Sequence, residues 1–146
     1  MPTVYTIGLE RRPLSDLIAT LREAGVDAVI DIRLHNTSQL AGYSKRDDFA
    51  FLLQEGFGIG YEHHPELGPT EEIMRAYRST RDWDAYRRGF EPLLAERDAL
   101  AVGRDLLSRF RAPCLLCAER DAGRCHRSLV AAYWAEHIPD VQVVHL

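Results

Sequence analysis

The chain of 146 residues has few cysteines, no long apolar run and no recognisable leader. Three cysteines, an odd and low number, exclude a framework of several disulfides and fit reduced thiols in the cytosol. No apolar run approaches the roughly 20 residues that a membrane-spanning helix needs, so no membrane partner is expected. The N-terminus lacks the basic and apolar regions of a signal peptide. These absences predict a cytoplasmic protein.

Lysine is almost absent too: of 18 cationic side chains only Lys45 is a lysine, and the other 17 are arginines. Arginine forks can recognise phosphates or carboxylates, but we attribute most of these residues to the codon usage of a GC-rich genome. The net charge of −4 argues against a broad nucleic-acid-binding surface and leaves room for a local basic pocket. An apolar fraction of 46% suits one globular domain, residues 1–146.

Short apolar runs alternate with segments of helical periodicity. We expect strands at residues 4–7, 28–33, 59–63, 114–118 and 141–146. We expect helices at residues 14–24, 45–55 and 125–137, and a charged helical insertion at about 70–112 with breaks near residues 80–82 and Gly103. This alternation predicts an α/β fold with a mostly parallel sheet of about five strands flanked by helices.

The carboxyl ends of the expected strands carry polar side chains, and ligands bind beyond these ends in open parallel sheets. Four separate segments therefore bring chemistry to the same edge of the sheet. Asp31 and Arg33 can pair with each other or present donors to a ligand. His63 and His64 should face opposite sides, so that at most one of them enters the site. The strand ends carry Gly8, Asp31, Arg33, His63, His64, Cys117 and Glu119.

The spacing Cys114-x-x-Cys117 lies within an expected strand. Residues three apart on a strand point to opposite faces, so this pair should neither chelate a metal nor form a redox disulfide. We interpret Cys114 as a small core residue. Cys117 shares its face with Glu119, and it is either a thiolate nucleophile, a metal ligand or a buried inert thiol. Glu119 is a candidate acid or base.

A helix is expected to begin at Cys125-His126-Arg127. Free N–H groups and the helix dipole at its start favour a bound anion or a Cys125 thiolate. Arg127 can add a two-pronged donor to such a site. Alternatively, it pairs with Glu119 or Asp31 only to hold the loop.

The same residues offer a second kind of chemistry, which is metal binding. Cys117, Cys125 and His126, with His63 or His64, have the ligand types of a zinc site. Their spacing is not that of a known zinc finger. The sequence therefore predicts no cofactor and leaves zinc as an alternative.

The insertion carries aromatic residues as well as mixed charges. Trp83, Tyr86 and Phe90 recur every three to four residues, which is more typical of a core-facing helical stripe than of a base-stacking platform. The interspersed charges of residues 70–111 indicate a solvated face. We therefore interpret the stripe as core and the charged positions as surface.

Several motifs together resemble the family called Domain of Unknown Function 488. The general features are Thr6-Ile7-Gly8, Asp31-x-Arg33, His63-x-Pro65-Glu66-Leu67, and Cys117-Ala118-Glu119 followed by Cys125-His126-Arg127. A subgroup is matched by Asp31-Ile32-Arg33-Leu34, by Ser38-Gln39-Leu40-Ala41-Gly42 and by Cys114-Leu115-Leu116-Cys117. The resemblance implies a compact α/β fold with the matching residues grouped at one edge. The family name records no activity, so the resemblance indicates a site and not a reaction.

The resemblance also draws attention to the loop after the second strand. It adds Asn36, Ser38 and Gln39 as possible hydrogen-bond donors to a ligand. Asn36 and Ser38 can equally well satisfy local turns. Leu9 stands where many members of the family carry a histidine, so a role for that histidine is not transferred to this chain.

The leading hypothesis is a small enzyme whose site lies at the carboxyl edge of the sheet. Its ligand is a small phosphorylated or nucleotide-like anion, which arginines and the helix start hold. The alternatives are a non-catalytic module that binds a nucleotide or a nucleic-acid end, and a Cys/His metal protein. The hypothesis assigns catalysis to Cys117, Glu119 and His126, and binding to Asp31, Arg33, Asn36, Ser38, Gln39, His63, Cys125 and Arg127.

Overall fold

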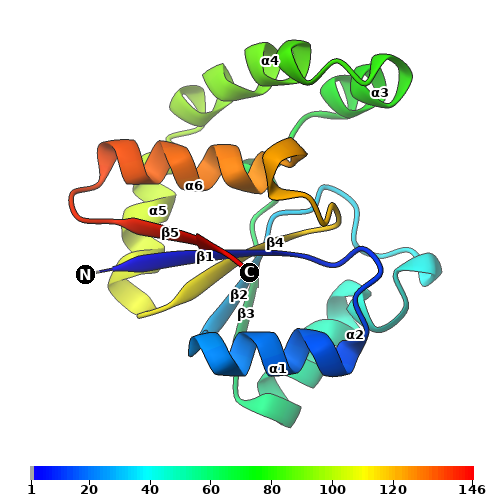
Figure 1. The fold of residues 1–146 in the computed structure, drawn as a ribbon, viewed down its shortest axis with the longest axis vertical. Helices are drawn as coiled ribbons and strands as arrows, with labels where there is room; N and C mark the ends of the chain where they lie inside the picture. Colours follow the sequence, from blue (N-terminus) through cyan, green and yellow to red (C-terminus); the bar gives the residue numbers. More distant parts are fainter. Residues whose placement is uncertain (1) are drawn as a thin grey trace.

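The computed structural model describes residues 2–146, in which five strands form one sheet (Figure 1). All pairs of neighbouring strands are parallel, and the order is β3-β2-β4-β1-β5. The α/β fold expected from the sequence is confirmed. The strands are β1 (Thr3–Gly8), β2 (Ala28–Asp31), β3 (Gly60–His63), β4 (Pro113–Cys117) and β5 (Gln142–His145).

Helices cover both faces of the sheet (Figure 1). On one face lie α1 (Leu14–Ala24) and α2 (Arg46–Phe51), and α2 continues as a π-helical turn over Leu52–Gly56. On the other face lie α5 (Ala99–Arg109) and α6 (His126–His137). None of the helices in residues 2–146 combines the length and the apolarity that crossing a bilayer requires.

Two hydrophobic clusters, one on each face, explain the apolar sequence of the central strand β4. Cys114 and Leu116 belong to the cluster between the sheet and α1, whereas Leu115 and Cys117 belong to the cluster between the sheet and α6. A strand that is buried on both faces needs apolar residues in succession rather than in alternation. The opposite orientations of Cys114 and Cys117 are thus confirmed. Burial raises the pKa of the Cys114 thiol, which fits an inert core residue.

The parallel arrangement places the carboxyl ends of all five strands at one edge, toward the right of Figure 1. The first two helices of the insertion, α3 (Glu71–Thr80) and α4 (Trp83–Glu96), lie beyond α6, away from the sheet. The break expected near residues 80–82 is confirmed. The insertion therefore adds a further helical layer above one face of the sheet.

The break expected at Gly103 is wrong, because this glycine lies inside α5. The chain breaks instead before Asp98, whose side chain accepts a hydrogen bond from the backbone N–H of Ala101. A Cβ at Gly103 would lie 2.6 Å from the ring of Trp134, a fully buried residue of α6. The indole N–H donates to the carbonyl of Ala99 at 2.8 Å and so holds the ring against α5. The glycine is required by helix packing and not by a helix end.

We expect Gly103→Ala to lower the free energy of unfolding by about 1–3 kcal/mol, because the added methyl group overpacks against the indole. Chemical denaturation monitored by circular dichroism measures this change. Gly89→Ala is the matched control, since Gly89 is exposed in α4 and its added Cβ meets only the side chain of Ile73 at 3.4 Å. The control should keep or gain stability through its higher helix propensity. Equal stability of wild type and Gly103→Ala would contradict the packing argument.

Candidate functional site

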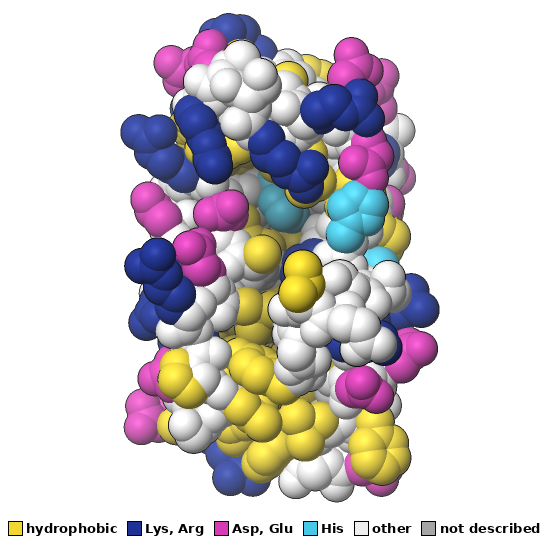
Figure 2. Space-filling view, turned by 90° about the vertical axis from the view of Figure 1, so that its right-hand side faces the viewer, with side chains coloured by type: hydrophobic (Ala, Val, Ile, Leu, Met, Phe, Trp, Pro, Cys, Tyr) yellow, Lys and Arg dark blue, Asp and Glu magenta, His cyan; other side chains and the backbone are white. Residues whose placement is uncertain are grey.

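A cavity of about 450 Å³ opens at the carboxyl edge, between the sheet and the helical insertion. Its floor is formed by residues 33–35 after β2, by the end of β4 and by the start of α6, and its roof by residues of α3 and α4. Figure 2 shows this side of the molecule, where a histidine is recessed in a hollow and Lys and Arg side chains gather above it. The cavity lies where the sequence predicts a site, but the insertion encloses it.

Cys117 and Cys125 form a disulfide at the floor of this cavity. Cys117 is the last residue of β4, and Cys125 caps the start of α6. Both are almost fully buried, and their Cα atoms are 7.6 Å apart. Reduced thiols were expected from the sequence, so this single bridge corrects that expectation. It arises because the loop after β4 folds back and brings a residue eight positions away against the strand end.

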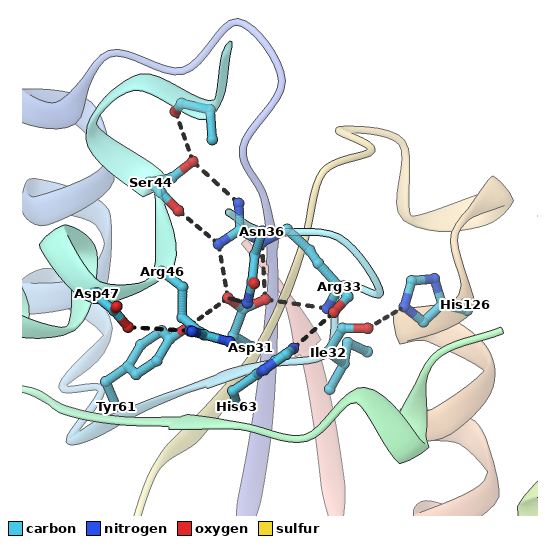
Figure 3. Close-up of polar contacts among 11 residues, drawn as sticks. Asp31, Ile32, Arg33, Asn36, Ser44, Arg46, Asp47, Tyr61, His63 and His126 are labelled. Carbon is cyan, nitrogen blue, oxygen red and sulfur yellow. Dashed lines mark hydrogen bonds and ion pairs between the residues drawn. The ribbon is translucent and has the colours of Figure 1, made fainter. Parts of the chain in front are cut away.

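His126 points into the cavity floor, and its tautomer is defined by its neighbours. Its Nε2 donates to the carbonyl oxygen of Ile32 at 3.0 Å (Figure 3), because a carbonyl can only accept. The other ring nitrogen, Nδ1, therefore keeps its lone pair and lies 3.9 Å from Sγ of Cys125. Burial lowers the pKa of His126 to about 4. The imidazole is thus neutral at physiological pH.

Arg127 is fully buried, and its guanidinium donates hydrogen bonds to the loop between β4 and α6. Its Nε donates to Oγ1 of Thr6 at 3.2 Å, and its Nη2 donates to the carbonyl of Arg120 at 3.0 Å. Its Nη1 donates to the carbonyl of Glu119 and lies 3.3 Å from Sγ of Cys117. Of the two roles weighed from the sequence, this geometry corresponds to loop holding. It uses backbone carbonyls in place of the carboxylates that were expected as partners.

Asp31 and Arg33 form a buried ion pair beneath the loop that follows β2 (Figure 3). The Arg33 guanidinium donates from Nε and Nη2 to the two carboxylate oxygens at 2.9 and 2.7 Å. Asn36 and Tyr61 donate to Oδ2 of the same carboxylate at 3.0 and 2.5 Å. Burial alone would raise the pKa of Asp31, but the hydrogen bonds and charge of Arg33, together with the hydrogen bonds from Tyr61 and Asn36, outweigh it and lower the pKa.

The remaining binding residues expected from the sequence lie outside the cavity lining. The ring of His63 contacts the carbonyl of Arg33 at 2.9 Å. The hydroxyl of Ser38 accepts from the backbone N–H of Leu40 at 3.1 Å, as in a local turn. Gln39 is exposed in the turn that follows. A ligand-binding role for these three residues and Asn36 stays a prediction.

The roof of the cavity contains residues that the sequence analysis did not assign to a site. Trp83 and Tyr86 stack with ring centres 4.8 Å apart, and both line the cavity. Phe90, the third member of the stripe, is fully buried as expected. The interpretation of the stripe as core is confirmed, because Tyr86 and Phe90 belong to the buried core and Trp83 packs against it. Trp83 and Tyr86 line the cavity in addition. Tyr77 also lines the roof, where Arg81 lies over its ring at 5.7 Å.

Three arginines face the cavity without an anionic partner. They are Arg78, Arg81 and Arg124, all of which are exposed. Across residues 2–146, no carboxylate lies within ion-pair distance of any of them. Glu119 is the only carboxylate among the residues that line this cavity. The cavity thus carries an excess of positive charge, although the whole chain is acidic.

A family model described as Domain of unknown function DUF488 matches residues 13–134. No curated protein and no solved structure matches the chain. The matched range includes every residue that lines the cavity. The likeness to the family therefore covers both the floor and the roof of the candidate site.

We expect Asp31→Asn to lower the free energy of unfolding by about 3–5 kcal/mol at neutral pH, because the change leaves the Arg33 charge buried without a counter-charge. The lowered pKa of Asp31 stabilises the fold above the unfolded pKa, about 3.9, and this contribution is lost as the pH falls through the folded value. Urea denaturation between pH 7 and pH 2 should therefore show an acid-side loss in the wild type that Asp31→Asn lacks.

Asp16→Asn is the control for this measurement. Asp16 pairs with Arg12 at 2.6 Å, but its side chain is 47% exposed, so the loss should stay below about 1 kcal/mol. Similar losses in the two variants would show that the buried pair contributes no more than a surface one.

Proposed function

The chain belongs to the family described as Domain of unknown function DUF488, and we propose that it is an enzyme acting on a small phosphorylated or nucleotide-like anion. One observation supports this proposal above all others. A pair of cysteine sulfurs lies at the floor of a cavity whose roof and rim carry three arginines without carboxylate partners. Cysteine sulfur and unpaired positive charge thus line the same cavity.

The anion is held by the exposed arginines, Arg78, Arg81 and Arg124. Their planar guanidinium groups match the geometry of phosphate and carboxylate oxygens. The sequence predicted that Arg33 and Arg127 bind the anion. In the structure Arg33 donates to Asp31, and Arg127 donates to backbone carbonyls. The role of these two buried arginines is to position the floor of the site.

Cys117 is the catalytic thiol once its bridge to Cys125 has been reduced. The guanidinium of Arg127 lies 3.3 Å from its sulfur, and a neighbouring positive charge favours the reactive thiolate. Glu119 lines the cavity on the same side and serves as the acid or base. His126, whose Nδ1 carries no hydrogen, is the second candidate for proton transfer.

A non-catalytic nucleotide-binding module is the second candidate function. The observation that favours it is the aromatic wall of Tyr77, Trp83 and Tyr86, which lies beside the arginines and offers a surface for a planar base. Such a module would use the same cavity, and its cysteines would be unreactive.

We expect pyrophosphate to bind the cavity, and Arg78→Ala, Arg81→Ala and Arg124→Ala each to weaken binding about tenfold, since a charged hydrogen bond contributes about 1.5 kcal/mol or more. Isothermal titration calorimetry of the purified protein measures this effect. Arg88→Ala is the matched control, because Arg88 is exposed on α4 and does not line the cavity. Unchanged affinity in all three cavity variants would exclude the proposed anion site.

We expect the reduced protein to react with iodoacetamide at Cys117 or Cys125 at pH 7, and pyrophosphate to slow this reaction. Mass spectrometry of the labelled peptides identifies the cysteine, and Cys114 serves as the internal control because it lies on the opposite face of β4 and does not line the cavity. The experiment is done with a chelator present. Pyrophosphate binding without any labelling of the cavity cysteines would favour the non-catalytic module over the enzyme.

A further inference from the structure

The residues of the cavity floor bring together three ligands of a kind that binds transition metals. One sulfur each from Cys117 and Cys125 and one ring nitrogen of His126 all lie within 4.8 Å of one another. No other such group of three or more His, Cys, Asp or Glu residues occurs in residues 2–146. We propose that, in the reduced protein, these three residues bind a single zinc ion.

The distance between Cys125 and His126, and the distance between the two cysteine Cα atoms, suit a tetrahedral ion once the disulfide has been reduced. With Zn–S of about 2.3 Å and Zn–N of about 2.0 Å, tetrahedral geometry places two sulfurs about 3.8 Å apart and a sulfur and a nitrogen about 3.6 Å apart. Sγ of Cys125 lies 3.9 Å from Nδ1 of His126. The Cα atoms of the two cysteines are 7.6 Å apart, which is wider than is usual for a disulfide. The backbone therefore leaves room for an ion between the two reduced sulfurs.

The surroundings of the ligands favour zinc as well. A metal-binding histidine commonly donates its second ring N–H to a carbonyl, and Nε2 of His126 does so toward Ile32. This bond holds the ring in place and leaves Nδ1 for the ion. Nη1 of Arg127 lies 3.3 Å from Sγ of Cys117 and stabilises the thiolate from the other side. Two thiolates and a neutral imidazole together balance the charge of Zn²⁺, which suits a buried site.

The ligand set leaves one coordination position open. His63 and His64, the fourth ligands considered from the sequence, contact the carbonyl of Arg33 and the carboxylates of Glu62 and Glu66. The cavity lies beside the three ligands, so the fourth position faces it. Three protein ligands and an open position are typical of catalytic rather than structural zinc sites. The ion would therefore contact the ligand of the cavity directly.

The disulfide seen in the structure is the metal-free, oxidised form of this site. A peroxide converts the zinc-bound form to the disulfide form by taking two electrons from the two zinc-bound thiolates. With hydrogen peroxide the S–S bond forms, the O–O bond breaks, and two protons from the solvent turn the two peroxide oxygens into two water molecules. Zn²⁺ then leaves, because a disulfide offers no thiolate ligand.

The test is the metal content of protein purified under reducing conditions without added zinc. We expect one zinc per chain by elemental analysis, and release of that zinc by hydrogen peroxide together with formation of the disulfide. Cys117→Ser, Cys125→Ser and His126→Gln should each lose most of the metal. Cys114→Ala and His137→Gln are the matched controls and should retain it, because neither side chain lies at the cavity. The proposal would be overturned if the Cys117→Ser variant and the Cys125→Ser variant each still contained one zinc per chain.

Cobalt provides a measurement that needs no variant. Co²⁺ added to the reduced, metal-free wild type should give the intense near-ultraviolet absorption of thiolate–cobalt bonds and the visible bands of a tetrahedral ion. Their absence would overturn the proposal even if the variants failed to fold. The inference is distinct from the proposed reaction, in which Cys117 and His126 act only when no ion is bound. Pyrophosphate binding reports on the arginines, whereas zinc content and the cobalt spectrum report on the sulfurs.

Discussion

The buried guanidinium of Arg127 is the constraint on which the candidate site depends. A charge removed from water is costly unless hydrogen bonds satisfy it, and here the carbonyls of Glu119 and Arg120 do so. The loop after β4 must fold over this group to present those carbonyls. That path brings Cys125 back against Cys117 at the end of the strand. The pairing of the two sulfurs is therefore a consequence of how one buried arginine is satisfied.

Burial divides the five arginines discussed above into two groups with different roles. Arg33 and Arg127 are buried, and their donors are used within the protein. Arg78, Arg81 and Arg124 are exposed at the cavity and have no carboxylate partner among the residues described. The first group makes the floor rigid, and the second gives the cavity its charge. Such a division fits an anion site in an acidic protein, because the positive charge is local.

The floor of the site could be predicted from the sequence in part. Residues at strand ends can be placed because parallel strands share one carboxyl edge, and Cys117 and Glu119 both reach the cavity there. The opposite faces of Cys114 and Cys117 follow from strand geometry. The roof could not be predicted, because the arginines of α3 look like any charged helix surface. Only the packing of the insertion above α6 turns Arg78 toward a cavity.

Local patterns were sufficient to predict the α/β class, the edge at which the cavity lies and the core role of Cys114, because these depend on periodicity within single elements. The tertiary structure alone decided that Arg127 holds a loop, that Cys125 meets Cys117, and that Trp83 lines a cavity. Each of these facts is a contact between segments that are separate in the chain. Such contacts depend on how loops form hydrogen bonds to buried charges and on how helices pack. The spacing of neighbouring residues determines neither of these.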